Sequence, residues 1–367
     1  MQADVNPFSL LGNRDDATVT NGGQEKGHLC HDRCSLSPLV DNHGRTVRYL
    51  RLSITDRCNL RCIYCCSNAR QTYIPHPQVL RYEEMARMVS IMAAMGVVKV
   101  RLTGGEPFAR KGSDEFLHML HKRFPNMDLR ITTNGTLLEP HIPLLRQIGV
   151  KAVNMSLDSF DRQTFAHVTG RDMLPAVLSS LDKLLEAGIK VKINAVAMRG
   201  INDRQMDDFI HAARTMPIDL RFIEFMPMGN GTLWNENTFW PAAQIRAEAE
   251  TRARLVSSHD DTGEAGPARM FAIEGGLGRL GFITAVSCHF CGSCNRLRLT
   301  SDGNLRTCLF DDREYGLRDM LRDASVSDAQ IGQFVREACA EKPIGAELLA
   351  SRTKGAVANK QMVGIGG

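Results

Sequence analysis

Six short runs rich in β-branched residues, with helix-like segments between them, restrict the fold of this chain more than any other feature. Four of the intervening segments carry apolar residues at helical spacing: 82–96, 114–124, 174–188 and 203–215. The β-branched runs themselves span residues 47–55, 98–104, 129–134, 152–158, 190–196 and 220–225. Parallel strands need a crossover connection, which is usually a helix, so this alternation predicts βαβ units. Six such strands in order predict an α/β fold, namely an incomplete (β/α)6 parallel barrel.

Four methionines recur on one face of the expected helix at 82–96. They are Met85, Met88, Met92 and Met95. Thioethers on one helical stripe fill a core well, whereas a metal site would need them to converge on one point. We therefore expect these side chains to be buried in the core.

Length and charge leave few function classes open. The 367 residues, 43% of them hydrophobic, suffice for one large domain with a smaller appended region. A net charge of +4 is too small to imply a nucleic-acid partner. No apolar run approaches the roughly 18 residues of a membrane span, so no membrane partner is expected.

Residues 1–40 lack a periodic apolar pattern, which is typical of a disordered tail. They do not resemble a signal peptide either, so the cytoplasm is the expected location. Cys30 and Cys34 fall in this tail and are interpreted as thiols without a metal.

Two separate groups of three cysteines predict metal chemistry. Cys58, Cys62 and Cys65 form a CxxxCxxC motif directly after the first expected strand, and the second group is Cys291, Cys294 and Cys308. Three thiolates can hold an iron–sulfur cube and leave its fourth iron open to a ligand. Thiolate also suits zinc, but zinc prefers four closed ligands.

Two further cysteines leave alternatives open. Cys66 follows the first group and could supply a fourth ligand only from an awkward neighbouring position. Cys288, three residues before Cys291, would close the second site if it bound iron. Whether Cys288 binds iron or is a spectator stays open on spacing alone.

Four polar signatures follow expected strands, where parallel barrels place their reactive groups. They are Thr103–Pro107, Thr132–Gly135, Ser156–Asp158 and Glu224–Pro227. All four are expected to face the first cysteine group. Gly104 and Gly105 lack a side chain and would let the backbone approach a ligand closely.

Several basic residues fall within expected strands. Alternation along strands flanked by helices would point Arg51, Arg101 and Lys192 into the barrel or the core, where an unpaired charge is costly. Arg296 and Arg298 are two residues apart and would share a face on an extended segment. Together these cations predict an anion-binding site.

The motifs CNLRCIYC, LTGGEP, ITTNG and SLDSFD resemble the radical S-adenosylmethionine superfamily. The wider set, with LRFIEFMPMG, FCGSCNRLRLTSDGNLRTCLF and the final IGG, is similar to the GTP 3',8-cyclases of molybdenum cofactor biosynthesis over residues 38–367. The chain departs from that pattern at Cys66-Ser67, where Met-Pro is common, and at Phe108-Ala109-Arg110, where leucines are common.

The resemblance implies an enzyme with two 4Fe-4S clusters, one on each cysteine group, and S-adenosylmethionine on the first. It implies conversion of GTP to (8S)-3',8-cyclo-7,8-dihydro-GTP, with guanine on the open iron of the second cluster. The implied S-adenosylmethionine pocket is Tyr64, Gly105, Ser156 and Met226. The implied GTP site is Arg51, Arg101, Thr132, Lys192, Arg296, Leu297 and Arg298, with Arg221 as a further candidate. The tail would enter the active site with Gly366 and Gly367 as catalytic residues.

The resemblance also implies an organisation and partners. The expected parts are the tail 1–40, a partial barrel 41–270, an auxiliary-cluster and substrate-binding region 271–345, and a C-terminal tail 346–367. A reduced flavodoxin or ferredoxin-type protein would donate electrons, and cyclic pyranopterin monophosphate synthase would act downstream. A homodimer is expected.

Two rival functions stay open from sequence. One is a peptide-modifying or sulfatase-maturing radical enzyme, which usually has more C-terminal cysteines and would not explain Arg296, Arg298 or the final IGG. The other is a non-catalytic metal-binding or electron-transfer protein, against which the TGGEP loop argues.

Overall fold

The computed structural model describes residues 37–65, 73–258, 266–351 and 357–366. They belong to one compact unit, Ser35–Gly367. Most of the expected tail 1–40, together with Cys30, Cys34, Cys66 and Gly367, lies outside the described residues.

All six expected strands are present and pair in parallel in sequence order. They are β1 (Tyr49–Ser53), β2 (Lys99–Thr103), β3 (Asp128–Thr133), β4 (Ala152–Ser156), β5 (Lys190–Ala197) and β6 (Asp219–Glu224). The fold is therefore α/β with a mostly parallel sheet, as predicted.

Six further strands, which sequence reasoning did not predict, extend this sheet at both ends. β10 pairs with β1 and β9 with β6, both in parallel. The remaining strands add antiparallel ends, giving the order β12-β11-β10-β1-β2-β3-β4-β5-β6-β9-β8-β7. The added strands are β7 (Leu255–Ser258), β8 (Ala268–Ile273), β9 (Arg279–Ile283), β10 (Arg296–Leu299), β11 (Asn304–Arg306) and β12 (Tyr315–Gly316).

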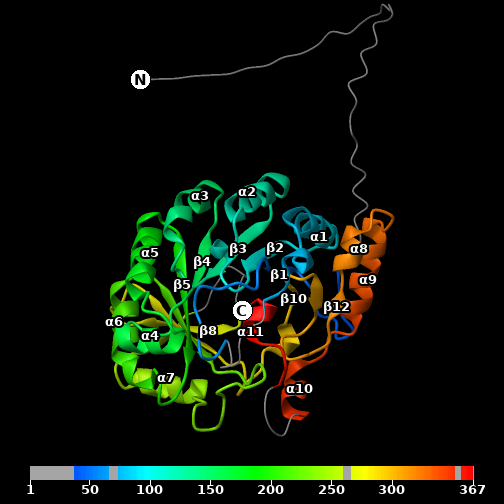
Figure 1. Cartoon of the computed structure of the whole chain (residues 1–367). Helices are drawn as coiled ribbons and strands as arrows, with labels where there is room; N and C mark the ends of the chain where they lie inside the picture. The colour runs from blue at the N-terminus through cyan, green and yellow to red at the C-terminus, as the bar shows by residue number, and fades with distance from the viewer. Residues whose placement is uncertain (1–36, 66–72, 259–265, 352–356, 367) are drawn as a thin grey trace, which may run out of the picture. The chain divides into compact units, whose positions relative to one another are not determined.

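The four expected helices are confirmed as α1 (Tyr82–Ala94), α2 (Ser113–Arg123), α5 (Leu174–Glu186) and α6 (Met206–Thr215). The others are α3 (Ile142–Gln147), α4 (Arg162–Thr169), α7 (Ala242–Glu250), α8 (Arg318–Arg322), α9 (Asp328–Ala340), α10 (Gly345–Ser351) and α11 (Met362–Ile365). Figure 1 shows the strands following a curve, with α1 to α7 on its outside and the short α11 within it.

The methionine stripe of α1 is buried as predicted. Met85, Met88, Met92 and Met95 are each 0% exposed and belong to the main hydrophobic core. The neighbouring strands β1 and β2 bury Leu50, Leu52, Val100 and Leu102 in the same core. Apolar side chains of these strands thus pack outward against helices, and the alternate positions, Arg51 and Arg101 among them, face the other way.

Strand register sets three arginines side by side. Arg51 of β1 pairs with Arg101 of β2 on one side and with Arg298 of β10 on the other. Residues in register on parallel strands point to the same face of a sheet. The basic residues predicted from three distant parts of the chain therefore form one row.

Buried Glu224, at the end of β6, fixes the loop that leads to the second cysteine group. Its carboxylate accepts hydrogen bonds from the backbone N–H of Val286 (2.7 Å), Ser287 (2.8 Å) and Ala242 (2.8 Å), and from the Ser287 hydroxyl. The residue is 0% exposed. These bonds compensate the burial of a charged group.

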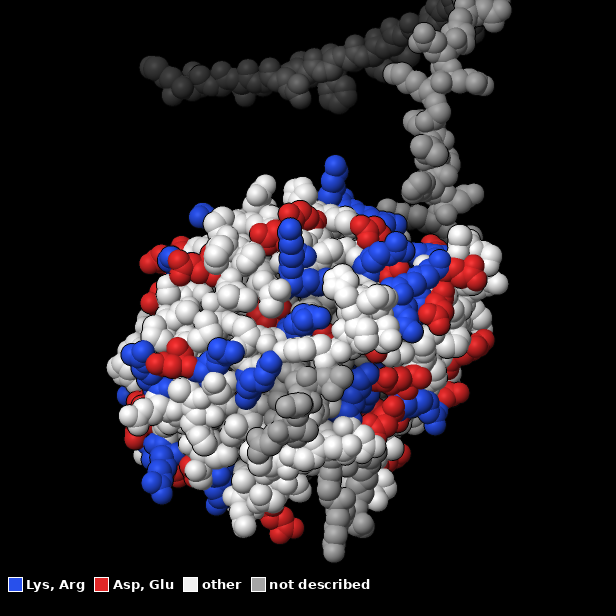
Figure 2. Space-filling model, in the orientation of Figure 1, with Lys and Arg blue, Asp and Glu red and all other residues white. Residues whose placement is uncertain are grey.

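The surface carries both signs of charge. On the face shown in Figure 2, basic and acidic side chains are interspersed. Among the described residues, no helix combines the length and apolar character needed to cross a membrane.

We predict that Glu224→Gln destabilises the fold by about 1.5–3 kcal/mol, because an amide group would turn a donor toward N–H groups that need an acceptor. Chemical unfolding of the metal-free protein measures this loss. The control is Glu250→Gln, since Glu250 is 40% exposed and pairs with Arg246 at the surface; it should change stability by less than about 1 kcal/mol. Equal effects of the two substitutions would contradict a buried anchoring role.

Candidate active site

A cavity of about 770 Å³ lies on the inner face of the sheet. It joins groups from both ends of the chain, because β10 is paired beside β1. All six nominated cysteines line it: Cys58, Cys62, Cys65, Cys291, Cys294 and Cys308.

The first cysteine group occupies the loop that follows β1. The Cys58 sulfur accepts hydrogen bonds from the backbone N–H of Leu60 (3.4 Å) and from the Asn134 amide (3.6 Å). Burial raises the pKa of Cys62, and the nearby Cys65 and Asp158 raise it further. N–H groups directed at a sulfur are suited to a thiolate that binds a cluster.

Gly105 brings the TGGEP loop against the cysteine loop. A Cβ on Gly105 would lie 2.3 Å from the Arg57 carbonyl oxygen and 2.9 Å from the Cys58 Cβ. Its backbone N–H donates to the Thr55 carbonyl (2.8 Å). The missing side chain was expected to let a ligand approach closely. In the structure it lets the backbone at Arg57 and Cys58 approach closely instead.

Two carboxylates, Glu106 in the loop after β2 and Asp158 in the loop after β4, are buried. Glu106 accepts from the Thr133 hydroxyl (2.8 Å) and the Asn134 N–H (2.7 Å), and burial raises its pKa to about 7. Asp158 accepts from the Tyr64 hydroxyl (2.7 Å), and burial raises its pKa to about 6. Both carboxylates connect neighbouring strand ends and so stiffen the rim around the first cysteine group.

The second cysteine group combines a short turn with the loop after β11. A Cβ on Gly345 would lie 2.9 Å from the Cys308 sulfur and 3.6 Å from the Cys291 sulfur, so these two thiols flank the start of α10. Burial alone would raise the pKa of Cys294, but nearby Arg296 and Lys342 lower it to about 7. Cys288 is exposed and is not part of the cavity lining.

Neither cysteine group is arranged for a single ion. Within the described ranges, no three His, Cys, Asp or Glu side chains lie close enough together to hold one metal ion. A cube of four irons and four sulfides is larger than an ion, so its thiolates stand further apart. Three thiols facing one cavity therefore suit a cluster better than structural zinc.

The predicted cations line the same cavity: Arg51, Arg101, Lys192, Arg296 and Arg298, together with Arg221. Thr132 lies among them, within 3.5 Å of the Arg101 guanidinium. Among the described residues, Arg51, Lys192 and Arg221 form no ion pair with a carboxylate, and two guanidinium nitrogens of Arg221 have no partner. Arg221 is buried, and Arg51 and Lys192 are half-buried. Cations in such positions without a carboxylate partner favour an anionic ligand.

Burial also lowers the pKa values of several of these cations. It lowers the pKa of Arg51 and Arg221 to about 10 and that of Lys192 to about 8. It lowers the pKa of Arg298 as well. A bound polyanion would offset this cost and keep every one of them charged.

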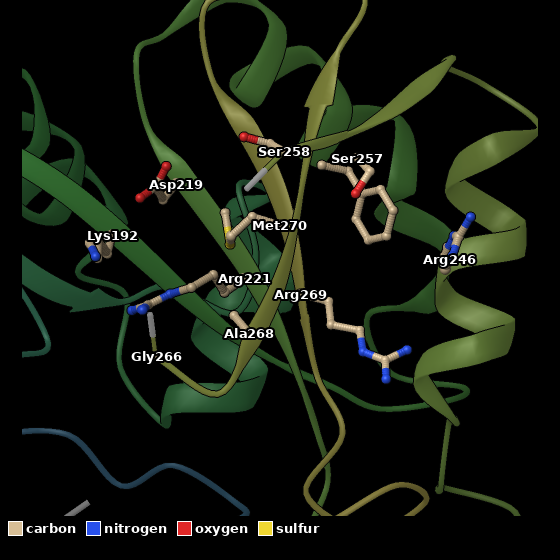
Figure 3. A pocket seen from close by; sticks show the side chains of 11 residues that line it. Lys192, Asp219, Arg221, Arg246, Ser257, Ser258, Gly266, Ala268, Arg269 and Met270 are labelled. Atoms are coloured by element: carbon tan, nitrogen blue, oxygen red, sulfur yellow. The ribbon is translucent and has the colours of Figure 1, made fainter. Parts of the chain in front are cut away.

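A smaller cavity of about 540 Å³ shares Lys192 and Arg221 with the main one. Figure 3 shows these two side chains on one side of the strands, while Arg269 and Arg246 lie on the other. The four cations of this cavity do not converge on one point, so the anion site belongs to the main cavity.

Tyr49 is a cavity residue that sequence reasoning missed. Its hydroxyl accepts a hydrogen bond from Arg101 Nε. Burial would raise its pKa, but Arg101 and Arg51 lower it to about 8. A tyrosine at the start of a strand carried no signal of its own, because tyrosine is common in strands.

The residues nominated for S-adenosylmethionine also line the main cavity. Tyr64, Gly105, Ser156 and Met226 all line the same cavity as the first cysteine group. Gly105 lies against Cys58, whereas Met226 packs in the small hydrophobic cluster that includes Cys308. Leu297, nominated for GTP, differs from its neighbours: its side chain is 0% exposed and packs in the hydrophobic core. Only its backbone could meet a ligand.

The C-terminal segment enters the arginine row. The Gly366 carbonyl accepts hydrogen bonds from Arg298 (3.2 Å) and Arg51 (3.5 Å). A Cβ on Gly366 would lie 2.6 Å from the Thr103 hydroxyl and 2.8 Å from the Ser53 Cβ, and its φ of +80° favours glycine. Gly367, also nominated as catalytic, lies outside the described residues.

Two family descriptions match most of the chain. The Radical SAM superfamily matches residues 52–213, which contain the first cysteine group. Molybdenum Cofactor Synthesis C matches residues 218–348, which contain the second.

Curated relatives match over nearly their whole length. A GTP 3',8-cyclase of Syntrophomonas wolfei is 42% identical, over 83% of this chain and 93% of its own. A GTP 3',8-cyclase of Agrobacterium fabrum is 41% identical, over 86% of this chain and 90% of its own. A mitochondrial GTP 3',8-cyclase of Arabidopsis thaliana is 38% identical, over 90% of this chain and 83% of its own.

Solved structures agree on the fold at much lower identity. Streptococcus suis SuiB bound to S-adenosylmethionine matches with a TM-score of 0.58 and 16% identity, over 85% of this chain and 70% of that chain. The anSMEcpe protein with bound AdoMet and a peptide matches with a TM-score of 0.53, over 83% of this chain and 84% of that chain. The relatives and the matched domains together show that this chain belongs to the GTP 3',8-cyclases, a family of radical S-adenosylmethionine enzymes of molybdenum cofactor biosynthesis.

Proposed function

We propose that this enzyme converts GTP to (8S)-3',8-cyclo-7,8-dihydro-GTP, the first step of molybdenum cofactor biosynthesis. One observation carries the proposal: both cysteine groups line a single cavity together with a row of cations that form no ion pair with any carboxylate of the described residues. Radical generation and polyanion binding can then occur side by side.

Cys58, Cys62 and Cys65 would hold one 4Fe-4S cluster, with S-adenosylmethionine against Tyr64, Gly105, Ser156 and Met226. Cys291, Cys294 and Cys308 would hold a second cluster beside the guanine base. Bound in this way, the first cluster and S-adenosylmethionine supply a carbon-centred radical able to remove the ribose 3' hydrogen. The protein contributes orientation and the exclusion of water.

The triphosphate would lie along the basic row. Arginine donates two hydrogen bonds in a plane to phosphate oxygens, which suits Arg51, Arg101 and Arg298. Lys192, Thr132 and Arg221 would complete the phosphate site, and Arg296 with the Leu297 backbone would face the base. A triphosphate supplies the negative charge that this row lacks.

The Gly366 carbonyl bridges Arg51 and Arg298, two residues nominated for substrate. We propose that Gly366 and Gly367 act in the radical step, and that the Gly366 carbonyl does so by setting the position of these guanidinium groups. The steric fit of Gly366 between Ser53 and Thr103 supports this role.

The proposed architecture is the incomplete (β/α)6 barrel, residues 41–270, followed by the auxiliary-cluster region 271–345 and the tail 346–367. A strand order that runs from β12 to β7, with antiparallel strands at both ends, supports an incomplete barrel. The proposed setting is a cytoplasmic homodimer that receives electrons from a reduced flavodoxin or ferredoxin-type protein. Its unstable product would pass to cyclic pyranopterin monophosphate synthase.

The substrate assignment predicts that GTP stimulates radical formation. We expect anaerobically reconstituted, reduced protein to form 5'-deoxyadenosine from S-adenosylmethionine strongly with GTP and weakly with ATP, and to yield a cyclised nucleotide. Chromatography with mass detection measures both products. Formation of 5'-deoxyadenosine that is indifferent to GTP would instead favour a peptide-modifying enzyme.

The tail assignment predicts that Gly366→Ala lowers GTP cyclisation by roughly 10²-fold, because the added methyl would displace the tail from the arginine row. Substrate consumption under saturating GTP measures the effect. Gly364→Ala is the matched control: its Cβ would make only an ordinary contact, 3.5 Å from the Lys360 side chain. Similar losses in both variants would argue against a specific role for residue 366.

The cluster assignment predicts that Cys291→Ala loses about half of the bound iron and abolishes GTP cyclisation, since each cube contains the same amount of iron. Cys288→Ala is the control, because Cys288 is exposed and outside the cavity lining. Iron analysis after reconstitution separates the two variants. Equal iron loss from Cys288→Ala would mean that Cys288 is a ligand and that the second cluster is closed.

A further inference from the structure

Lys342 is a buried lysine beside the second cysteine group. It follows α9 and is 2% exposed. Its ammonium group donates hydrogen bonds to the carbonyls of Thr307 (2.5 Å) and Arg296 (3.2 Å), and it lies 3.7 Å from the Cys294 sulfur. Thr307 directly precedes Cys308, and Arg296 is two residues after Cys294. All three contacts therefore belong to the segments that carry the second cysteine group.

A buried ammonium group needs a negative partner, because burying an isolated charge is costly. No described carboxylate forms an ion pair with Lys342, although ion pairs are numerous elsewhere in the described chain. Two of its contacts are neutral carbonyls. The Cys294 sulfur is the remaining contact, and as a thiolate it is negative.

The backbone around Lys342 is held by a second buried cation. Arg45 pairs with Asp41 (2.6 Å) and donates to the carbonyls of Lys342 (3.0 Å) and Cys291 (2.9 Å). Arg45 thus has its own carboxylate, whereas Lys342 does not. Hydrogen bonds therefore hold Lys342 at two points. Its backbone carbonyl accepts from Arg45, and its ammonium group donates to the carbonyls of Arg296 and Thr307.

We propose that Lys342 is a positioning residue for the second cluster, where its ammonium group donates to the Cys294 thiolate and stabilises the more negative, reduced state. The inference rests on the proposed function, which places a cluster on Cys291, Cys294 and Cys308. A fixed positive charge next to a ligand sulfur raises the reduction potential of the cluster. No described contact joins Lys342 to the first cysteine group, so the first cluster should be unaffected.

The test compares Lys342→Met, which keeps the length of the side chain and removes the charge, with Lys342→Arg, which keeps the charge. Lys183→Met is the control, because Lys183 is 47% exposed and pairs with Glu139 away from both cysteine groups. Each cluster is titrated alone, in full-length protein whose other cysteine group is replaced by alanine. Iron and sulfide analysis and redox titration followed by electron paramagnetic resonance are the readouts.

We expect Lys342→Met to shift the potential of the second cluster to more negative values, with the first unchanged, and Lys342→Arg and Lys183→Met to resemble the parent. Selective loss of second-cluster iron in Lys342→Met but not in Lys342→Arg would also support the proposal. An unchanged potential, or equal iron loss in the Met and Arg variants, would overturn it. A parent protein that binds no cluster at the second group would refute the cluster assignment itself, a result visible before any Lys342 variant is measured.

Discussion

The parallel pairing of β10 with β1 is the constraint on which the rest of this structure depends. It places residues 296–299 in register with residues 49–52, although about 250 positions separate them along the chain. The cysteine loop after β1 and the cysteine segment before β10 then open onto one cavity. Without that pairing the two cysteine groups would belong to separate sites, and the arginine row would lose Arg298.

The same pairing concentrates positive charge at a cost. Arg51, Arg101 and Arg298 stand next to one another on adjacent strands, where like charges repel. The chain offsets part of the cost with the Tyr49 hydroxyl and the Gly366 carbonyl, which are dipoles and carry no full charge. Positive charge in this row therefore stays without a full counter-charge until an anion binds, and the proposed binding of a triphosphate would draw on that imbalance.

Sequence periodicity predicted the central six strands, four of the helices and the inward direction of Arg51, Arg101 and Lys192, because these follow from local patterns. It missed β7 to β12, whose short runs resemble the surrounding loops and gain their structure only by joining an existing sheet edge. Cysteine spacing singled out the two groups of thiols, which do line one cavity. Lys342, Arg45 and Tyr49 were missed because a lone lysine, arginine or tyrosine shows its environment only after distant segments have met. Leu297 stood in a nominated motif, yet alternation between Arg296 and Arg298 sends its side chain to the core.

The two cysteine groups differ in how much of the chain each requires. The first is framed by the loops after β1, β2, β3 and β4 and by the end of α4, all contributed by residues before about 171. The second is framed by Asp41 and Arg45 near one end and by Lys342 and Gly345 near the other. During synthesis the first frame can form while the ribosome is still at work, whereas the second must wait for nearly the whole chain. On the proposed assignment, the cluster on Cys58, Cys62 and Cys65 would therefore be inserted first and the cluster on Cys291, Cys294 and Cys308 last.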